Sequence, residues 1–383
     1  MENIVFEQIK EYTPCYLLDV YELHRRVRWL KERLPKRVKL CFAMKANSFL
    51  ISELENLVER FEVCSFGEFQ ICKGQRIDAK KLVISGVKKE KDEVLAMMDY
   101  QSGIFTVESM SQFALLKDCN REIKILLRLT SGNQFGMKEE EIEEILSHQH
   151  EYPYLHIVGL EYFSGTQKRK RQIEKELEYL DNYIKKIKKT YDIELEELEY
   201  GGGFPICYYE GQEDEEEEFL QCFSDSVVKM EFQGNFILEL GRSIVASCGT
   251  YITQIKDIKD NQNGNFAIVD GGMHQMVYYG SGLSMRKPMM EVRPYRDEEK
   301  KDYNVCGSLC TINDFLVKHL EADLRVGDYL LFKNTGAYSL TEGISLFLSR
   351  DLPSIFLYKD NRVIRIRDKV ETYVFNTYRK EGE

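Results

Sequence analysis

The feature that most constrains this chain is a regular alternation of short apolar segments with amphipathic segments. The apolar segments have the length of β-strands, and the amphipathic ones have the spacing of helices. In the longest helical segment, residues 172–189, apolar side chains follow one another along a single face. The first apolar segment ends at Met44. The other seven cover residues 62–65, 82–85, 103–106, 123–129, 155–163, 198–200 and 236–239.

Eight strand–helix units of this size predict a (β/α)8 barrel with parallel strands. The structural alternative is a doubly wound sheet, in which a glycine-rich nucleotide turn follows the first strand. Here the first strand ends in a lysine, and the glycine-rich turn comes much later, at residues 201–203. The sequence therefore favours the barrel.

The alternation stops near residue 249, and the remaining chain predicts a mostly-β domain. Two expected strands, 249–259 and 266–270, flank Asn263-Gly264, a strong signal for a tight hairpin turn. Further strands are expected at 329–333, 355–358 and 363–367, and the first residues, to about Leu18, are expected to form a short strand. We assign residues 17–249 to the barrel and residues 1–16 and 250–383 to the β domain.

Charge and composition exclude several classes of function. The net charge is −11 without a basic block, so nucleic-acid binding is not expected. No apolar run reaches the length of a membrane span, and the N-terminus lacks the pattern of a signal peptide. The ten cysteines are scattered, which fits reduced thiols in a cytoplasmic protein. Cys306 and Cys310 lack paired ligands nearby, so no metal site is expected.

Lys45 stands at the end of the first barrel strand, where catalytic groups of this fold gather. On the strand face that it shares, Cys41 and Ala43 are small and leave room for a bulky group beside it. Taken alone, this stretch also fits a surface lysine that extends its ammonium group into water. The other strand ends decide between the two interpretations.

Strands seven and eight end in a glycine turn, Gly201-Gly202-Gly203, and in Glu239-Leu240-Gly241-Arg242. Glycines let backbone N–H groups close around a phosphate, although a tight strand-to-helix turn would need them equally. Arg242 could add positive charge to the same phosphate. Glu239 is a carboxylate in an apolar strand, which requires a cationic partner such as a pyridinium nitrogen. Together with Lys45, these groups describe a site for pyridoxal 5′-phosphate.

Five motifs occur in an order that resembles the diaminopimelate/ornithine decarboxylase family, and the resemblance covers nearly the whole chain. The motifs are Phe42-Ala43-Met44-Lys45-Ala46-Asn47, Gly201-Gly202-Gly203-Phe204-Pro205, Glu239-Leu240-Gly241-Arg242, Gly307-Ser308-Leu309-Cys310 with Asp314, and Gly336-Ala337-Tyr338. The resemblance implies an alanine-racemase-like barrel with a C-terminal β domain that completes the active site and the dimer interface. It also implies pyridoxal-phosphate-dependent decarboxylation of an amino acid.

Residue roles follow from the resemblance. Lys45 resembles the lysine that carries the cofactor, and Glu239 the partner of the ring nitrogen. The phosphate contacts are implied for Thr166, Gly202, Gly203, Gly241, Arg242 and Tyr338. Cys310 resembles the cysteine that protonates the decarboxylated carbon in the partner subunit, which implies a homodimer with shared active sites. By itself, Cys310 would equally fit a buried structural thiol.

Departures from the family pattern concern the substrate. Phe163 stands where the family stacks a histidine on the cofactor ring, and Glu161 replaces a second histidine. Thr311 replaces an acidic residue that commonly helps to bind a diamino acid, which weakens the case for a distal ammonium group. Arg286, Thr311 and Asp314 are the candidate substrate residues, and Arg293 is a further arginine that could meet a carboxylate, although both arginines also fit a surface role.

The run from Phe163 to Gln167 and the stretch Asp270-Gly271-Gly272-Met273-His274 resemble a branch of the family that acts on glutamate held as a thioester on an acyl carrier protein, as in butirosin biosynthesis. We therefore expect a glutamyl-carrier type of substrate. Three alternatives remain: a free diamino acid (diaminopimelate, ornithine or lysine), racemisation on the same cofactor, against which Glu239 argues, and a catalytically inactive regulator, against which the intact cofactor residues argue.

Overall fold

The computed structural model describes residues 2–278 and 286–378, and the chain forms two compact units. The barrel unit consists of Val27–Ile206 and Asp214–Ile244. The sheet unit consists of Met1–Arg26, Cys207–Glu213 and Val245–Glu383. The barrel unit thus lies inside the range 17–249 assigned from the sequence, with residues 207–213 left out.

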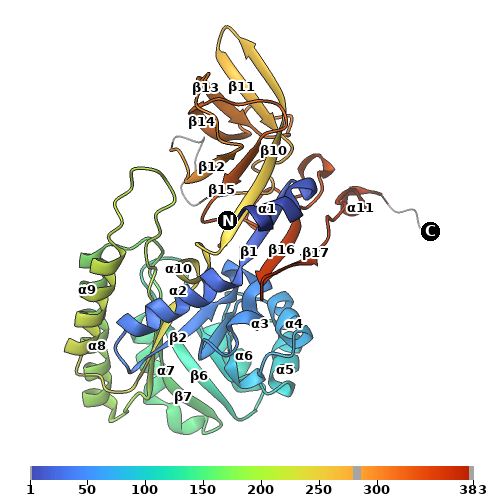
Figure 1. Cartoon of the computed structure of the whole chain (residues 1–383). Helices are drawn as coiled ribbons and strands as arrows, with labels where there is room; N and C mark the ends of the chain where they lie inside the picture. Colours follow the sequence, from blue (N-terminus) through green and yellow to red (C-terminus); the bar gives the residue numbers. More distant parts are fainter. Residues whose placement is uncertain (1, 279–285, 379–383) are drawn as a thin grey trace. The chain divides into compact units, whose positions relative to one another are not determined.

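The barrel unit contains eight parallel strands that close on themselves in chain order (Figure 1). The last strand pairs with the first, and Cys41 lies opposite Glu239 in that register. This closed parallel barrel confirms the predicted fold class. Its strands are β2 (Val38–Ala43), β3 (Arg60–Val63), β4 (Leu82–Ile84), β5 (Ile104–Val107), β6 (Ile123–Leu129), β7 (Leu155–Tyr162), β8 (Glu197–Gly201) and β9 (Asn235–Leu240).

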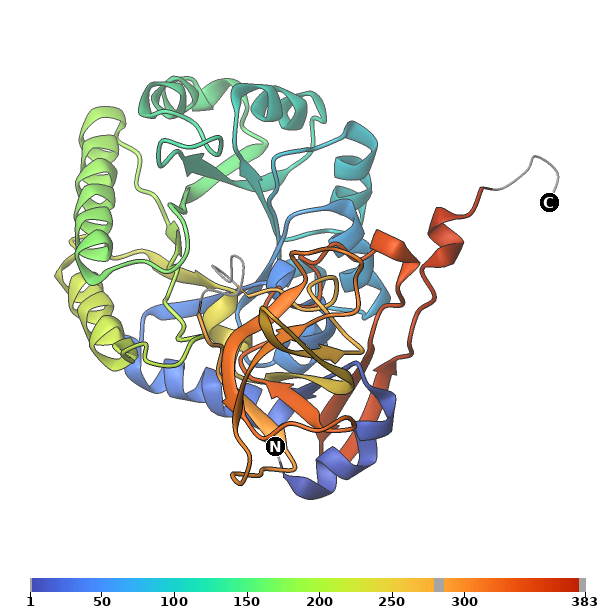
Figure 2. The same ribbon diagram turned by 90° about the horizontal axis from the view of Figure 1, so that it is seen from above.

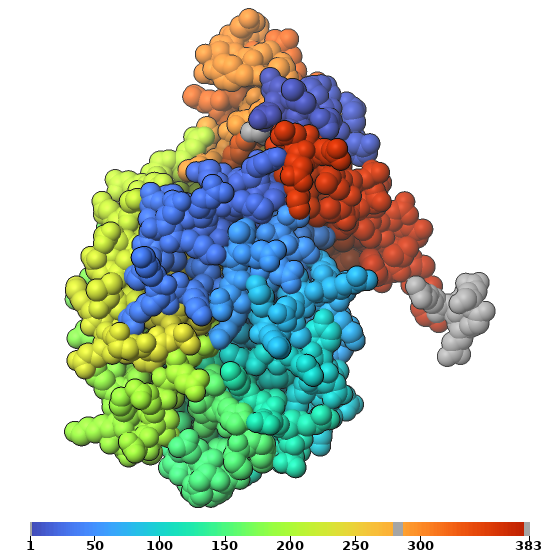
Figure 3. Space-filling model, turned by 60° about the horizontal axis from the view of Figure 1, so that its bottom comes forward, coloured from blue at the N-terminus to red at the C-terminus, as the bar shows by residue number. Residues whose placement is uncertain are grey.

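Helices lie outside these strands, as the view along the barrel shows (Figure 2). The space-filling view shows the surface of the chain coloured in sequence order, with residues of the barrel unit in blue to yellow (Figure 3). The helices are α3 (Ile51–Leu54), α4 (Phe66–Gly74), α5 (Lys91–Asp99), α6 (Met110–Asp118), α7 (Glu139–Ser147), α8 (Lys170–Tyr191) and α9 (Glu216–Lys229), while α2 (Val20–Arg33) and α10 (Arg242–Val245) run across the unit boundaries. Among the described residues, no helix combines the length and the apolar character needed to span a bilayer.

The sheet unit is built on one mixed sheet of nine strands. Its order is β14-β13-β11-β10-β1-β16-β17, and β15 pairs with both β10 and β12. The strands are β1 (Cys15–Asp19), β10 (Gly249–Asn261), β11 (Gly264–Val269), β12 (Met290–Arg293), β13 (Lys301–Cys306), β14 (Phe315–Ala322), β15 (Tyr329–Phe332), β16 (Ser354–Lys359) and β17 (Arg362–Arg367), with two short helices, α1 (Asn3–Ile9) and α11 (Tyr373–Asn376).

The hairpin expected around Asn263-Gly264 is confirmed, because β10 and β11 pair antiparallel up to Asn261 and Gly264. The expectation of a strand over the first residues is wrong for residues 3–9, which form helix α1. Val5, Phe6 and Ile9 have helical spacing and pack on Cys15, Leu17, Ile252, Leu331 and Phe356. A helix as short as α1 is not stable by itself, so burial of this apolar face is what stabilises it.

Candidate active site

Lys45 lies just past the end of β2, in a 3-10 turn formed by Met44–Ala46. Its Nζ is 2.5 Å from Glu62 Oε2 and 3.8 Å from Glu239 Oε1. The Lys45 side chain is 36% exposed, whereas the side chains of both carboxylates are almost completely buried. The Lys45 side chain is therefore accessible to solvent, although the carboxylates beside it are buried.

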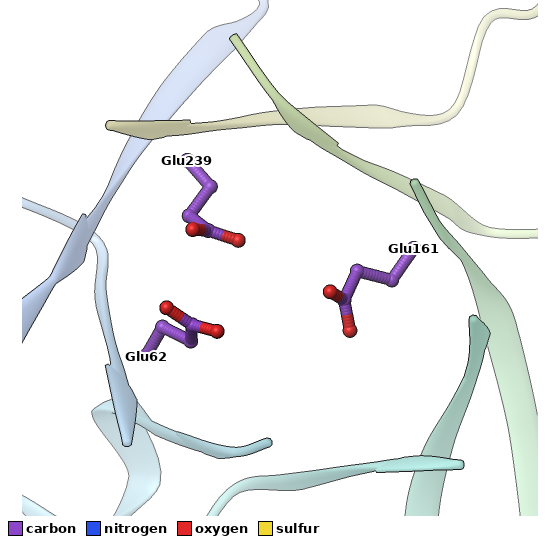
Figure 4. Close-up of side chains that lie close together, drawn as sticks. All are labelled: Glu62, Glu161 and Glu239. Carbon is purple, nitrogen blue, oxygen red and sulfur yellow. The ribbon is translucent and has the colours of Figure 1, made fainter. Parts of the chain in front are cut away.

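Three carboxylates meet inside the barrel (Figure 4), and Lys45 lies within 4 Å of two of them. Glu62 comes from β3, Glu161 from β7 and Glu239 from β9, and one oxygen of each lies within 4.8 Å of the others. The strand alternation brings this about. Phe61 and Val63 flank Glu62 and point to the opposite face of β3, so the glutamate points into the barrel.

Arginines on neighbouring strands neutralise part of this charge. Arg128 on β6 lies with its Nη1 3.1 Å from Glu108 Oε1 and its Nε 3.4 Å from Glu161 Oε1. Arg60 on β3 lies with its Nη1 3.4 Å from Glu199 Oε2. The interior of this barrel is therefore a network of charges, and not the layered aliphatic core that the fold commonly has.

Burial and the neighbouring carboxylates shift the pKa values of this network. Burial raises the pKa of Glu161 to about 7, against the opposing effect of Arg128, and raises the pKa of Glu199 to about 8. The pKa of Glu239 is also raised well above its usual value, first by burial and then by Glu62. A cation bound beside Glu239 would favour its ionised form.

Glu62 differs from the other two carboxylates. Its burial alone would raise its pKa, but the ammonium group of Lys45 and the hydrogen bonds from Lys45 and Cys64 bring the pKa below the usual value. Three converging carboxylates could hold a metal ion in principle. Here the lysine ammonium is already the cation that Glu62 contacts, which fits a lysine-based site better.

The glycine turn Gly201–Gly203 follows β8 and tolerates no side chain. A Cβ on Gly201 would lie 2.3 Å from the ring of Phe163, and a Cβ on Gly203 would lie 2.2 Å from the carbonyl oxygen of Gly165. Gly203 also has a positive φ of 58°. A Cβ on Gly202 would lie 2.8 Å from the Leu238 side chain. The N–H group of Gly202 donates to the carbonyl of Glu239, so it is not available to a phosphate.

The predicted cofactor residues of the barrel unit come together at this rim. Gly201 on β8 pairs with Glu239 on β9. Gly241 and Arg242 come directly after β9 and therefore lie next to the glycine turn. Phe163 and Thr166 lie in the loop after β7, and the backbone N–H of Lys168 at the end of that loop donates to the carbonyl of Gly203. Arg242 is 8% exposed. Lys45, Glu239 and a turn lined by glycines thus share one end of the barrel, and this donor set fits pyridoxal phosphate.

The remaining predicted residues lie in the sheet unit. Cys310 is exposed, and Thr311 follows it in the loop 307–314. Asp314, a candidate substrate residue, is buried, and its two oxygens accept N–H groups of Met273 and Leu309 at 2.8 Å each. Its carboxylate therefore fastens this loop to the turn at residues 271–273.

Tyr338 is half-buried and has a positive φ of 63°. Arg286 is exposed, with its guanidinium carbon 5.6 Å from the ring centre of Tyr209. Arg293 forms an ion pair with Glu291 at 3.0 Å and lines a cavity of about 970 Å³ within the sheet unit. The carboxylate that Arg293 contacts in this structure is therefore that of Glu291.

Sequence reasoning missed several charged residues that support the site: Glu62, Arg128, Lys168 and Glu176. Glu62, Arg128 and Glu176 have a signal in the sequence, because each interrupts an apolar pattern, whereas Lys168 stands in the polar run 164–172 and has no such signal. Glu62 stands between Phe61 and Val63, and Glu176 stands on the same helix face as Ile173 and Leu180. A charge at a buried position needs a partner, and such interruptions could have been read as site residues.

Comparison with known proteins identifies the class of enzyme. The model of the family "Pyridoxal-dependent decarboxylase, pyridoxal binding domain" matches residues 20–246, which is more than half of the chain. The chain belongs to this family of pyridoxal-dependent decarboxylases. It is therefore an enzyme of pyridoxal-phosphate-dependent amino-acid decarboxylation.

Three curated relatives cover most of the chain. It is 26% identical to the diaminopimelate decarboxylase of Haemophilus influenzae, over 88% of this chain and 86% of that protein. It is 28% identical to a 2-[(L-alanin-3-ylcarbamoyl)methyl]-2-hydroxybutanedioate decarboxylase of Staphylococcus aureus, over 92% and 96%. It is 26% identical to an L-glutamyl-[BtrI acyl-carrier protein] decarboxylase of Niallia circulans, over 93% and 91%.

Among solved structures, the chain is similar to the diaminopimelate decarboxylase of Methanocaldococcus jannaschii in complex with L-lysine. The TM-score is 0.84 at 23% identity, and the alignment covers 95% of this chain and 91% of that one. The fold of a parallel barrel with a mixed β-sheet domain is therefore shared.

Proposed function

We propose that this decarboxylase acts on an amino acid whose far end carries no free ammonium group, and that a glutamyl group held as a thioester on an acyl carrier protein is the first candidate. The observation that carries this proposal is the chemistry of the loop 307–314. Thr311 follows Cys310 where an acidic residue would bind a distal ammonium group. The only carboxylate of that loop, Asp314, uses its two oxygens on backbone N–H groups.

Two of the relatives support this substrate class. The relative from Niallia circulans is named for a glutamyl group on a carrier protein. The relative from Staphylococcus aureus is named for a substrate that ends in a hydroxybutanedioate, an acid at the far end. Neither name describes a free diamino acid.

The residues of this chain divide the work as follows. Lys45 would hold the cofactor through its ε-amino group. Pyridoxal phosphate, when bound, accepts the electron pair of the carbon–carbon bond that breaks as carbon dioxide leaves. Glu239 would keep a proton on the ring nitrogen, and Phe163 would pack against the ring. The glycine turn with Gly241, Arg242, Thr166 and Tyr338 would hold the phosphate.

The last step is delivery of a proton to the α-carbon. We assign it to Cys310 of the partner subunit, in a homodimer with shared active sites. Cys310 is exposed on its loop, and the neighbouring Ile312 is 87% exposed. An exposed thiol is what donation of a proton to the active site of a partner subunit would require.

The test is a comparison of substrates with the purified enzyme. Carbon dioxide release and product mass should be followed with free diaminopimelate, ornithine, lysine and glutamate, and with glutamate loaded on an acyl carrier protein. We expect turnover on the loaded carrier and at least about 10²-fold lower kcat/KM on each free diamino acid. Efficient turnover of a free diamino acid would contradict the proposal.

A free diamino acid is the second candidate. It is favoured by the relative from Haemophilus influenzae, which is named diaminopimelate decarboxylase. The two candidates differ in the effect of Thr311→Glu. A diamino-acid enzyme should gain activity from the added carboxylate, whereas an enzyme for an acidic or carrier-bound substrate should lose activity.

A further inference from the structure

A second lysine of the barrel unit lies directly beneath the glycine turn. Lys168 ends the loop that carries Phe163 and Thr166, and its side chain is 1% exposed. Its Nζ donates to the carbonyl of Gly201 at 2.8 Å, to Glu176 Oε2 at 2.8 Å and to the Tyr200 hydroxyl at 3.2 Å. An ammonium group has three N–H donors, so this one is fully satisfied.

Glu176, on α8, ties the two loops together from the other side. Its Oε1 accepts from Ser164 Oγ at 2.5 Å and from Gln172 Nε2 at 3.0 Å, and its Oε2 accepts from Tyr200 at 2.6 Å. Burial would raise the pKa of Glu176, but Lys168 and these hydrogen bonds lower it below the usual value. The pair is therefore an ion pair that links β7, α8 and β8.

The backbone continues the same connection. The N–H group of Lys168 donates to the carbonyl of Gly203 at 3.0 Å, and the side chain of Gln167 makes two hydrogen bonds to the backbone of Ile206. A Cβ on Gly203 would lie 2.9 Å from Lys168 Cε. The glycine turn is thus fitted closely around the aliphatic part of this lysine.

The pair also has a direction. The ammonium group is 2.8 Å from both Glu176 Oε2 and the carbonyl oxygen of Gly201, so it contacts the carboxylate and the turn at the same time. Its positive charge is therefore in direct contact with the turn to which we assign the phosphate. In a buried environment such a dipole acts with little screening.

We propose that Lys168 is a positioning residue for the cofactor phosphate: it fixes the glycine turn through Gly201 and Gly203 and provides positive potential beneath it. Glu176 holds Lys168 in place. This inference rests on the proposed placement of the phosphate at the glycine turn, and it does not depend on the substrate.

The test compares two cofactor forms, pyridoxal phosphate and pyridoxal, which differ only in the phosphate. Their dissociation constants are measured on the full-length protein by cofactor absorbance for the parent, Lys168→Met and the double variant Lys168→Met/Glu176→Met. We expect Lys168→Met to weaken pyridoxal phosphate by about 10-fold to 100-fold, by analogy with residues that orient ligands. Pyridoxal should change by less than about twofold, within the ordinary context dependence of such contacts.

The double variant separates this role from a merely structural one. Removal of both buried charges should restore folding if Lys168→Met folds poorly, but it should not restore the preference for the phosphorylated form. Lys89→Met is the matched control, since Lys89 also donates to a buried carbonyl of the barrel unit, that of Gly86. It should leave the ratio of the two dissociation constants unchanged.

Two outcomes would overturn the inference. One is an equal loss of affinity for both cofactor forms in Lys168→Met. The other is a double variant whose ratio of the two dissociation constants equals that of the parent. Arg242→Met distinguishes failure of the inference from failure of the phosphate placement. If Arg242→Met lowers the preference for pyridoxal phosphate and Lys168→Met does not, only the role of Lys168 is wrong. If neither variant changes it, the phosphate does not bind at this turn.

Discussion

Two lysines of the barrel unit each form an ion pair with a glutamate, but they differ in exposure and in their other contacts. Lys45 lies 2.5 Å from Glu62 and Lys168 lies 2.8 Å from Glu176. The side chain of Lys45 is 36% exposed and also faces Glu239, whereas that of Lys168 is 1% exposed and has three acceptors. An amine that reacts must be reachable, and an amine that supports a loop must be held. The comparison therefore assigns chemistry to Lys45 and positioning to Lys168.

The largest expected effect is that of Lys45→Ala. Loss of this amine removes the group that binds the cofactor covalently, so the visible absorbance of the bound cofactor should disappear. Turnover should fall by at least about 10³-fold, the scale for loss of a nucleophile. Absorbance spectra and carbon dioxide release check this, with Lys39→Ala, an exposed lysine of β2, as the control. Retained turnover in Lys45→Ala would refute the role of Lys45.

Glu239→Gln should come next. The amide keeps the size of the side chain but cannot hold the ring nitrogen protonated, so the cofactor should remain bound while kcat falls by about 10²-fold. The measurement is kcat together with the absorbance spectrum. Unchanged kcat would remove the role of Glu239, and loss of the cofactor would show that it acts in binding instead.

Lys168→Met should act on stability. It leaves Glu176 buried without its cation, which commonly costs about 3–5 kcal/mol. In Lys168→Met/Glu176→Met most of this loss should be recovered, because no charge stays buried. Urea unfolding of the three proteins measures the difference. If the double variant is as unstable as the single one, the loss of stability does not come from a buried charge without a partner.

The smallest expected effect is a pH dependence that comes from Glu161. The pKa of Glu161 is raised to about 7 in the folded protein, against about 4.3 in an unfolded chain. Between these values the folded state binds a proton that the unfolded state has lost, so this group lowers stability as pH rises from about 4 to about 7. Above that range its contribution stays constant.

Glu161→Gln removes this titration. The stability of the variant relative to the parent should therefore rise across the same window, by about 4 kcal/mol at most. Urea unfolding of the cofactor-free protein at several pH values measures it, with Glu140→Gln, an exposed residue of α7, as the matched control. A difference between parent and Glu161→Gln that is flat in pH would show that Glu161 is ionised throughout.

The sequence predicted the barrel and the ends of its strands because the alternation of apolar and amphipathic segments is strong there. Lys45, Glu239 and the glycine turn could be predicted because position along a strand determines which end of a parallel barrel a residue reaches. The ion pair of Lys168 and Glu176 could not, since it depends on how a loop folds back on a helix. Helix α1 was missed for a related reason: its apolar residues fit either period, and packing on β1 and β10 decides between them.

The comparison of the two lysines can be tested directly in the enzyme with its cofactor bound. Reduction with borohydride fixes the cofactor permanently to the amine that holds it, and peptide mass mapping then shows which lysine carries the added mass. We predict the label on Lys45 and none on Lys168. A label on Lys168, or on any lysine other than Lys45, would contradict it.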